Sequence, residues 1–157
     1  MDIIEQVKQC NVSYHVLGKS DRSAMPIGNG ELCASVWTDA EGKIKFYLSR
    51  SDALTELDRT VKLGLVQVTV SPNPFKNGDL CQELDVADGC LTISGTGTRI
   101  WMCVDPQTNQ IVIRGESERE VTVTAEYFTW RDRPVSFQGE SAYRSSIQES
   151  ADVVSQD

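Results

Sequence analysis

The sequence has little of what metal sites and catalytic triads need. It contains a single histidine, His15, and its five cysteines form no C-x-x-C pair, so neither a zinc site nor another metal or cofactor site is expected. A hydrogen-bonded structural role is favoured for His15 over a catalytic one. No apolar run approaches the ~20 residues that a membrane-spanning helix needs.

Positive charge is also scarce. Lys and Arg number 15 against 23 Asp and Glu, which gives a net charge of -8. An acidic surface repels nucleic-acid phosphates and anionic lipids, so no nucleic acid and no membrane is expected as a partner. The first ten residues lack the basic and long apolar regions of a signal peptide. With cysteines interpreted as reduced core residues, this predicts a cytoplasmic location, the alternative being a secreted parent protein.

Hydrophobic spacing divides the chain into a short N-terminal helix or extension, residues 1–11, and one domain, residues 12–157. In the N-terminal segment, apolar residues fall at helical spacing, which predicts a short amphipathic helix that caps the domain. These residues are Ile3, Ile4, Val7 and Cys10.

From Val12 onward, apolar residues alternate with polar ones, which is typical of half-buried strands. Residues 32–37 and 44–48 alternate around a turn at 39–42 and predict a hairpin, and residues 84–86 and 91–93 predict another around Asp88-Gly89. About nine or ten short strands separated by turns predict an all-β fold, an antiparallel β-sandwich. Ala151–Val154 is interpreted either as an interrupted strand or as part of a frayed terminus.

A glycine-rich loop precedes the first hairpin. Gly28, Asn29 and Gly30 tolerate positive φ, so their main chain can approach a ligand or another domain. The Gly-Lys-Ser/Thr ending of a phosphate-binding loop is missing. A structural turn is the favoured interpretation.

A second polar segment, residues 49–56, follows the first hairpin. It contains Ser51, Asp52 and Glu56, and a short helix is expected from Ser51 to Leu57. On one helical turn the two carboxylates would point the same way, whereas glycosidases place theirs on opposite sides of the scissile bond. Helix capping by Ser51 or Asp52 is therefore favoured over catalysis.

The three tryptophans allow two interpretations. Trp37, Trp101 and Trp130 could form a platform that stacks on sugar rings, because aromatic faces are large apolar surfaces. All three lie in or beside predicted strands, so core packing is favoured. The residues alone therefore establish no active site.

Several motifs together resemble glycoside hydrolase family 95. Residues 24–32, AMPIGNGEL, resemble its "PLGNG" signature. An uncharacterised microbial group related to that family is more similar still, in residues 44–53 (IKFYLSRSDA), 61–68 (VKLGLVQV) and 71–75 (SPNPF). The resemblance extends from about Val12 to Val154. Two expected aromatic residues are missing, one at Leu54 and one around Ser13-Tyr14.

The resemblance implies an incomplete galactose-mutarotase-like β-supersandwich. In such proteins this domain precedes an (α/α)6 barrel, which carries the general acid and base and is absent from this chain. The resemblance thus implies a non-catalytic N-terminal domain that packs against the barrel of a parent O-glycosyl hydrolase, with Gly28, Asn29 and Gly30 facing the barrel and Ser51 and Asp52 nearby. The alternatives are a free-standing carbohydrate-binding module and a protein-interaction module.

Overall fold

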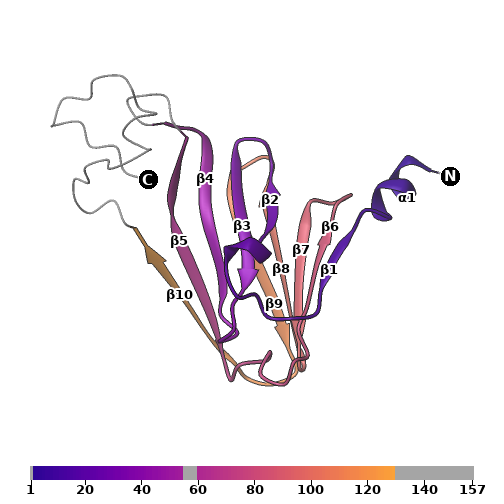
Figure 1. The fold of residues 1–157 in the computed structure, drawn as a ribbon, viewed down its shortest axis with the longest axis vertical. Helices are drawn as coiled ribbons and strands as arrows, with labels where there is room; N and C mark the ends of the chain where they lie inside the picture. Colours follow the sequence, from indigo (N-terminus) through magenta and orange to yellow (C-terminus); the bar gives the residue numbers. More distant parts are fainter. Residues whose placement is uncertain (1, 55–59, 130–157) are drawn as a thin grey trace.

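The computed structural model describes residues 2–54 and 60–129. Within these ranges the chain forms two five-stranded antiparallel sheets, so the predicted all-β sandwich is confirmed (Figure 1). The first sheet contains, in spatial order, β1 (Val12–Tyr14), β6 (Cys81–Asp85), β7 (Cys90–Gly95), β8 (Thr98–Asp105) and β9 (Gln110–Ser117). The second contains β10 (Thr122–Phe128), β5 (Thr60–Ser71), β4 (Ile44–Leu54), β3 (Leu32–Thr38) and β2 (Met25–Gly28).

Both predicted hairpins are confirmed. In β3–β4, Val36 pairs with Phe46, and in β6–β7, Leu84 pairs with Leu91. The β3–β4 turn is held by Asp39, whose Oδ1 accepts hydrogen bonds from the backbone N–H groups of Glu41 and Lys43 at 2.9 and 3.0 Å. Such a side-chain turn fixes the hairpin register.

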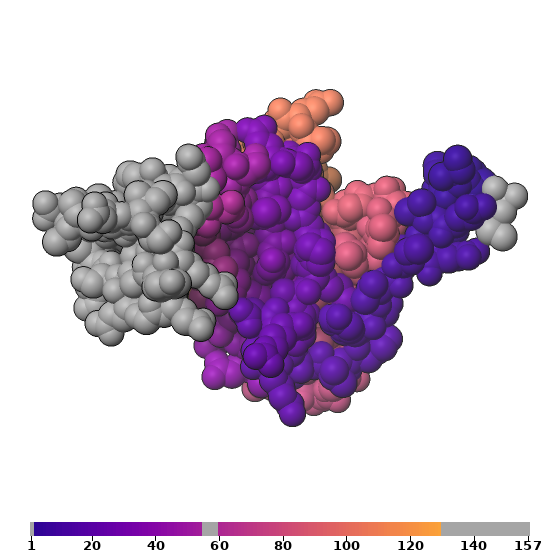
Figure 2. Space-filling view, turned by 45° about the horizontal axis from the view of Figure 1, so that its top comes forward, coloured from indigo at the N-terminus to yellow at the C-terminus, as the bar shows by residue number. Residues whose placement is uncertain are grey.

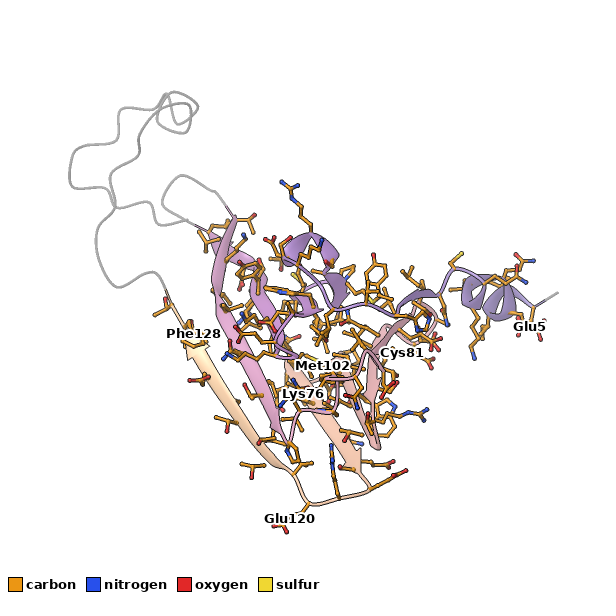
Figure 3. All side chains as sticks on the ribbon, turned by 60° about the horizontal axis from the view of Figure 1, so that its bottom comes forward. Glu5, Lys76, Cys81, Met102, Glu120 and Phe128 are labelled. Carbon is orange, nitrogen blue, oxygen red and sulfur yellow. The ribbon has the colours of Figure 1, made fainter. Side chains whose placement is uncertain are left out.

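The core lies between the sheets and comes mainly from β2 to β5 on one side and β7 and β8 on the other. Its completely buried members include Val36, Phe75, Leu91, Ile93 and Met102, each at 0% exposure. Figure 3 shows Met102 in the layer of side chains between the sheets. Burial of each such side chain contributes about 1.5–3 kcal/mol to folding.

One polar pair crosses this core. The Thr38 hydroxyl donates to Gln82 Oε1 at 3.0 Å, and Gln82 Nε2 donates to the Val36 carbonyl at 3.3 Å. Both side chains are 2% exposed, so these bonds offset the cost of burying them. The pair links β3 of the second sheet to β6 of the first.

The N-terminal helix forms but does not cap the domain. Helix α1 (Ile3–Lys8) has no buried residue, and Ile3 is 75% exposed. Figure 2 shows it projecting away from the sandwich. The apolar spacing therefore predicted the helix correctly, whereas its packing against the sheets was wrong. No helix among the described residues is long and apolar enough to span a membrane.

Ser51 and Asp52 lie in a strand, which corrects the predicted helix. Strand β4 continues through them to Leu54, although its register with β5 shifts after Leu48 and again after Ser49. On the β3 side, Arg50 pairs with Leu32 and the Ser51 N–H donates to the Glu31 carbonyl at 2.9 Å, so this segment has a long-range backbone hydrogen bond in place of a local helical one. Residues 55–57 of the predicted helix, with Glu56, and the predicted strand at 151–154 lie outside the described residues.

The sandwich is open where β9 and β10, the edge strands of the two sheets, lie on the same side. Their core-facing sides border a cleft of about 210 Å³, lined by residues that include Val70, Ile113 and Val123. Ile113 is 38% exposed and Val123 60% exposed. Figure 3 follows this edge from Glu120, before β10, to Phe128 at its end.

Candidate functional site

The glycine-rich loop connects β2 to β3 and is organised by Asn29. Its Oδ1 accepts hydrogen bonds from the backbone N–H groups of Glu31 and Leu32 at 3.0 and 2.8 Å. Gly30 has a φ of 92°, which a residue with a side chain rarely adopts. The predicted tight turn at this sequence is confirmed, and β2 occupies Met25–Gly28 directly before it.

Asn29 also ties this loop to the first sheet. Its Nδ2 donates to the Asp105 carbonyl at 3.2 Å and to Asn109 Oδ1 at 2.6 Å. Asp105 ends β8, and Asn109 lies in the turn between β8 and β9. The side chain therefore fastens two loops from opposite sheets at one end of the sandwich.

The β8–β9 turn is itself braced by Asp105. Its Oδ1 accepts from the backbone N–H groups of Gln107 at 2.8 Å and Thr108 at 3.2 Å. The bond from Gln107 is the main reason that the pKa of Asp105 lies below its ordinary value. The carboxylate thus stays charged and holds the turn in one conformation.

Arg50 brings the two predicted polar segments together. Its guanidinium contacts Glu31 Oε1 at 2.6 Å and Asp52 Oδ1 at 2.8 Å. Ser51 joins through its backbone, because its N–H donates to the Glu31 carbonyl at 2.9 Å. Asn109 Nδ2 completes the group by donating to Glu31 Oε2 at 2.7 Å.

The result is an exposed polar network of Asn29, Glu31, Arg50, Asp52 and Asn109. Its two carboxylates contact the same guanidinium, whereas a glycosidase pair would flank a scissile bond. Exposed ion pairs of this kind contribute little stability, so positioning of the loops is the main consequence. The helix-capping role expected for Ser51 and Asp52 is wrong, because both lie in β4.

Sequence reasoning missed Glu31, Arg50 and Asn109 as members of this network. Glu31 and Arg50 stand beside the residues that were singled out, so polar residues flanking a loop were the available signal. The contact between Asn109 and Glu31 spans 78 positions and has no local signal.

The tryptophans that the structure describes differ in burial. Trp37 is 6% exposed, with its ring centroid 5.1 Å from that of Tyr47, so the expected packing role is confirmed. Trp101 lies half-buried on the outer face of the first sheet, so core packing is wrong for this residue. Trp130 lies outside the described residues.

The cysteines are unpaired, but they are not core residues. Cys10 and Cys33 are exposed, and Cys81, Cys90 and Cys103 are partly buried. Alternation explains the four cysteines in strands, since the core-facing positions are taken by neighbours such as Met102. Burial, with a further contribution from Cys103, raises the pKa of the Cys90 thiol to about 11, which keeps it protonated at neutral pH.

The described residues offer few further candidates for catalysis or metal binding. His15 follows β1, is exposed, and makes no hydrogen bond within the described part of the chain, so the predicted hydrogen-bonded role is wrong. Across residues 2–54 and 60–129, no group of three or more His, Cys, Asp or Glu side chains is arranged to hold a metal ion.

Comparison with known proteins gives one family. The family model DUF5703_N, described as "Domain of unknown function (DUF5703)", matches residues 13–157. No curated protein matches the sequence. Because the family match covers nearly all of the sequence, the chain belongs to the DUF5703 family.

Proposed function

We propose that this chain is a non-catalytic N-terminal β-sandwich domain of a carbohydrate-processing protein, and that it packs against a helical catalytic domain of the same protein. The observation that carries the proposal is the open edge between β9 and β10. There, Ile113, Val123 and Tyr127 expose apolar surface on the core-facing side of their sheets.

An apolar face that none of residues 2–54 and 60–129 covers, next to two edge strands, is a typical surface for packing by further polypeptide. Tyr127 is already oriented for such packing. Its hydroxyl donates to the Leu63 carbonyl at 2.7 Å, and its ring lies over Gly64, where a Cβ would collide with it. An ordered aromatic side chain loses little entropy when a partner covers it.

The carbohydrate part of the proposal is supported by the motif resemblance to glycoside hydrolase family 95 and the related group. The non-catalytic part is supported by the polar network, in which Glu31 and Asp52 both contact Arg50. The galactose-mutarotase-like supersandwich and the cytoplasmic location belong to this proposal as well, the latter supported by the unpaired cysteines.

The test compares this chain with the product of its complete reading frame. We expect several hundred codons of helical periodicity after Asp157, hydrolysis of aryl glycosides by the complete product, and none by the chain alone. A stop codon directly after Asp157 would overturn the proposal. So would turnover by the chain alone that Asp52→Asn abolishes.

Self-association provides a further control. The chain alone is expected to sediment as a monomer in analytical ultracentrifugation at micromolar concentration. A concentration-dependent dimer that Val123→Asp dissociates would identify the edge as an interface between copies and contradict the proposal.

A further inference from the structure

A groove of about 990 Å³ lies on the outer face of the first sheet, and one end of it adjoins the β8–β9 turn that Asn29 of the polar network contacts. Trp101 forms part of its lining, together with side chains from β7, β8 and β9 and from the turns beside them. Alternation along β8 explains this position. Ile100 and Met102 enter the core at 6% and 0% exposure, so Trp101 faces outward between them.

A cation outside the groove lining contacts the indole. The Arg99 guanidinium lies 5.8 Å from the centre of a Trp101 ring. Arg99 precedes Trp101 along β8, whereas Cys103 and Asp105, which line the groove, follow it. The cation–π contact with Arg99 therefore helps to orient the ring.

Hydrogen-bonding groups border the same aromatic surface. Arg114 of β9 pairs directly with Trp101 in the sheet, and Glu116 lies two residues further along β9. Within the described ranges, the side chains of Arg114 and Glu116 make no ion pair or hydrogen bond with the protein. Gln107 and Asp88 add donors and acceptors from the two adjoining turns.

The wall formed by the β8–β9 turn is preorganised. Asn29 donates hydrogen bonds to the backbone carbonyl of Asp105 and to the side chain of Asn109. Within the turn, the Asp105 carboxylate accepts a hydrogen bond from the Gln107 N–H. A wall fixed before binding lowers the entropy cost of recognising a ligand. Gln107 thus projects from a turn with a defined conformation.

We propose that this groove binds a neutral saccharide, with the Trp101 ring against a sugar face and with Arg114, Glu116 and Gln107 bonding to hydroxyl groups. An aromatic surface bordered by both donors and acceptors suits a polyol, which has an apolar face and an equatorial rim of hydroxyls. Charge favours a neutral sugar over an anionic one, since the carboxylates of Asp88, Asp105 and Glu116 outnumber the guanidinium groups of Arg114 in the lining and Arg99 beside it. This site is independent of the proposed domain packing at β9 and β10.

Affinity gel electrophoresis tests the proposal with four soluble probes, namely a glucan, a galactan, a xylan and polygalacturonate. We expect at least one neutral polysaccharide to retard the chain. Trp101→Ala should weaken that retardation by about tenfold or more, and Arg114→Ala by a smaller factor. Phe128→Ala is the matched control, because Phe128 is an exposed aromatic outside the groove, and it should migrate like the wild type.

A thiol measurement on the wild-type chain covers the case in which Trp101→Ala fails to fold. Cys90 and Cys103 line the groove, whereas Cys33 is exposed on the other sheet. The retarding polysaccharide should slow alkylation of Cys103 and leave the alkylation of Cys33 unchanged; Cys90 is not used, because its raised pKa keeps it protonated and slow to react.

Four results would overturn the saccharide site. One is a wild-type chain that none of the neutral probes retards. The second is retardation that persists in a folded Trp101→Ala variant. The third is retardation without protection of Cys103, and the fourth is preferential retardation by polygalacturonate. None of these results bears on packing at the β9–β10 edge, so the two proposals fail separately.

Discussion

Strands β8 and β10 have the same apolar alternation and very different burial. In β8, Ile100, Met102 and Val104 are 6%, 0% and 7% exposed, whereas in β10 Val123 and Tyr127 are 60% and 58% exposed. Both strands are paired along their length, β8 with two neighbours and β10 with β5. The difference follows from position: β8 lies inside its sheet with β2 of the other sheet close to it, whereas β10 is an edge strand whose Val123 borders the open cleft.

The largest expected effect contrasts the two regions directly. Met102→Ala in β8 should lower the free energy of unfolding by about 2–5 kcal/mol, because Met102 is 0% exposed and a cavity would replace its side chain. Val123→Ala should change it by less than about 0.5 kcal/mol. Urea unfolding of both variants measures the contrast, and equal losses would show that β10 is buried in solution.

The polar pair inside the closed region should give the next largest effect. Gln82→Leu leaves the Thr38 hydroxyl and the Val36 carbonyl without their partner, at a cost of about 1–3 kcal/mol. Glu83→Gln, at the adjacent exposed position, serves as the control and should be nearly neutral. A Gln82→Leu variant as stable as the wild type would mean that the pair does not join the sheets.

Asn29 tests whether the loops at the end of the sandwich are fastened by one side chain. Asn29→Ala should lower the free energy of unfolding by about 1–2 kcal/mol and speed amide hydrogen exchange in the β8–β9 turn. Asn29→Asp keeps the oxygen that accepts from Glu31 and Leu32 but loses the donor to Asp105 and Asn109. It should therefore loosen the β8–β9 turn while sparing the β2–β3 turn. Unchanged exchange in both variants would contradict the proposed fastening.

The smallest expected effect comes from removing the charge of Asp39 in the turn of the β3–β4 hairpin. Burial raises the pKa of Asp39, but the hydrogen bonds from Lys45, Lys43 and Glu41 outweigh it, so its pKa lies below the ordinary 3.8. The stability from this carboxylate is present above about pH 4 and is lost as the pH falls through the lowered pKa. Asp39→Asn should lower the free energy of unfolding by about 1 kcal/mol at pH 7. The stability difference between the variant and the wild type should shrink as the pH falls below about 4. A difference that does not change with pH would exclude the charge as its cause.

Much of the fold follows from local sequence. Alternation and turn residues predicted both hairpins because each strand buries one face and its register is set by short-range contacts such as those of Asp39. Alternation alone could not predict which face of each strand is covered by other residues. Trp37 and Trp101 occupy similar places in their strands, yet Trp37 packs against Tyr47 and Trp101 borders an open groove.

The candidate site was predictable only in part. Gly28, Asn29 and Gly30 drew attention through their backbone chemistry, and Ser51 and Asp52 through their polarity. Their connection depends on Arg50 and on Asn109, which folding brings from the other sheet. Helix propensity misplaced Ser51 because its backbone hydrogen bond to the Glu31 carbonyl, a contact distant in sequence, overrides a weak local preference.

The most direct test of the packing proposal is hydrogen exchange of β10 in this chain and in the product of the complete reading frame. A covering domain predicts that amides of β10 gain protection in the complete product, and that Val123→Asp removes this gain. Thr124→Asp, with the same charge on the opposite face of the strand, should retain it. Identical exchange of β10 in both proteins would show that nothing packs on this edge and would contradict the account.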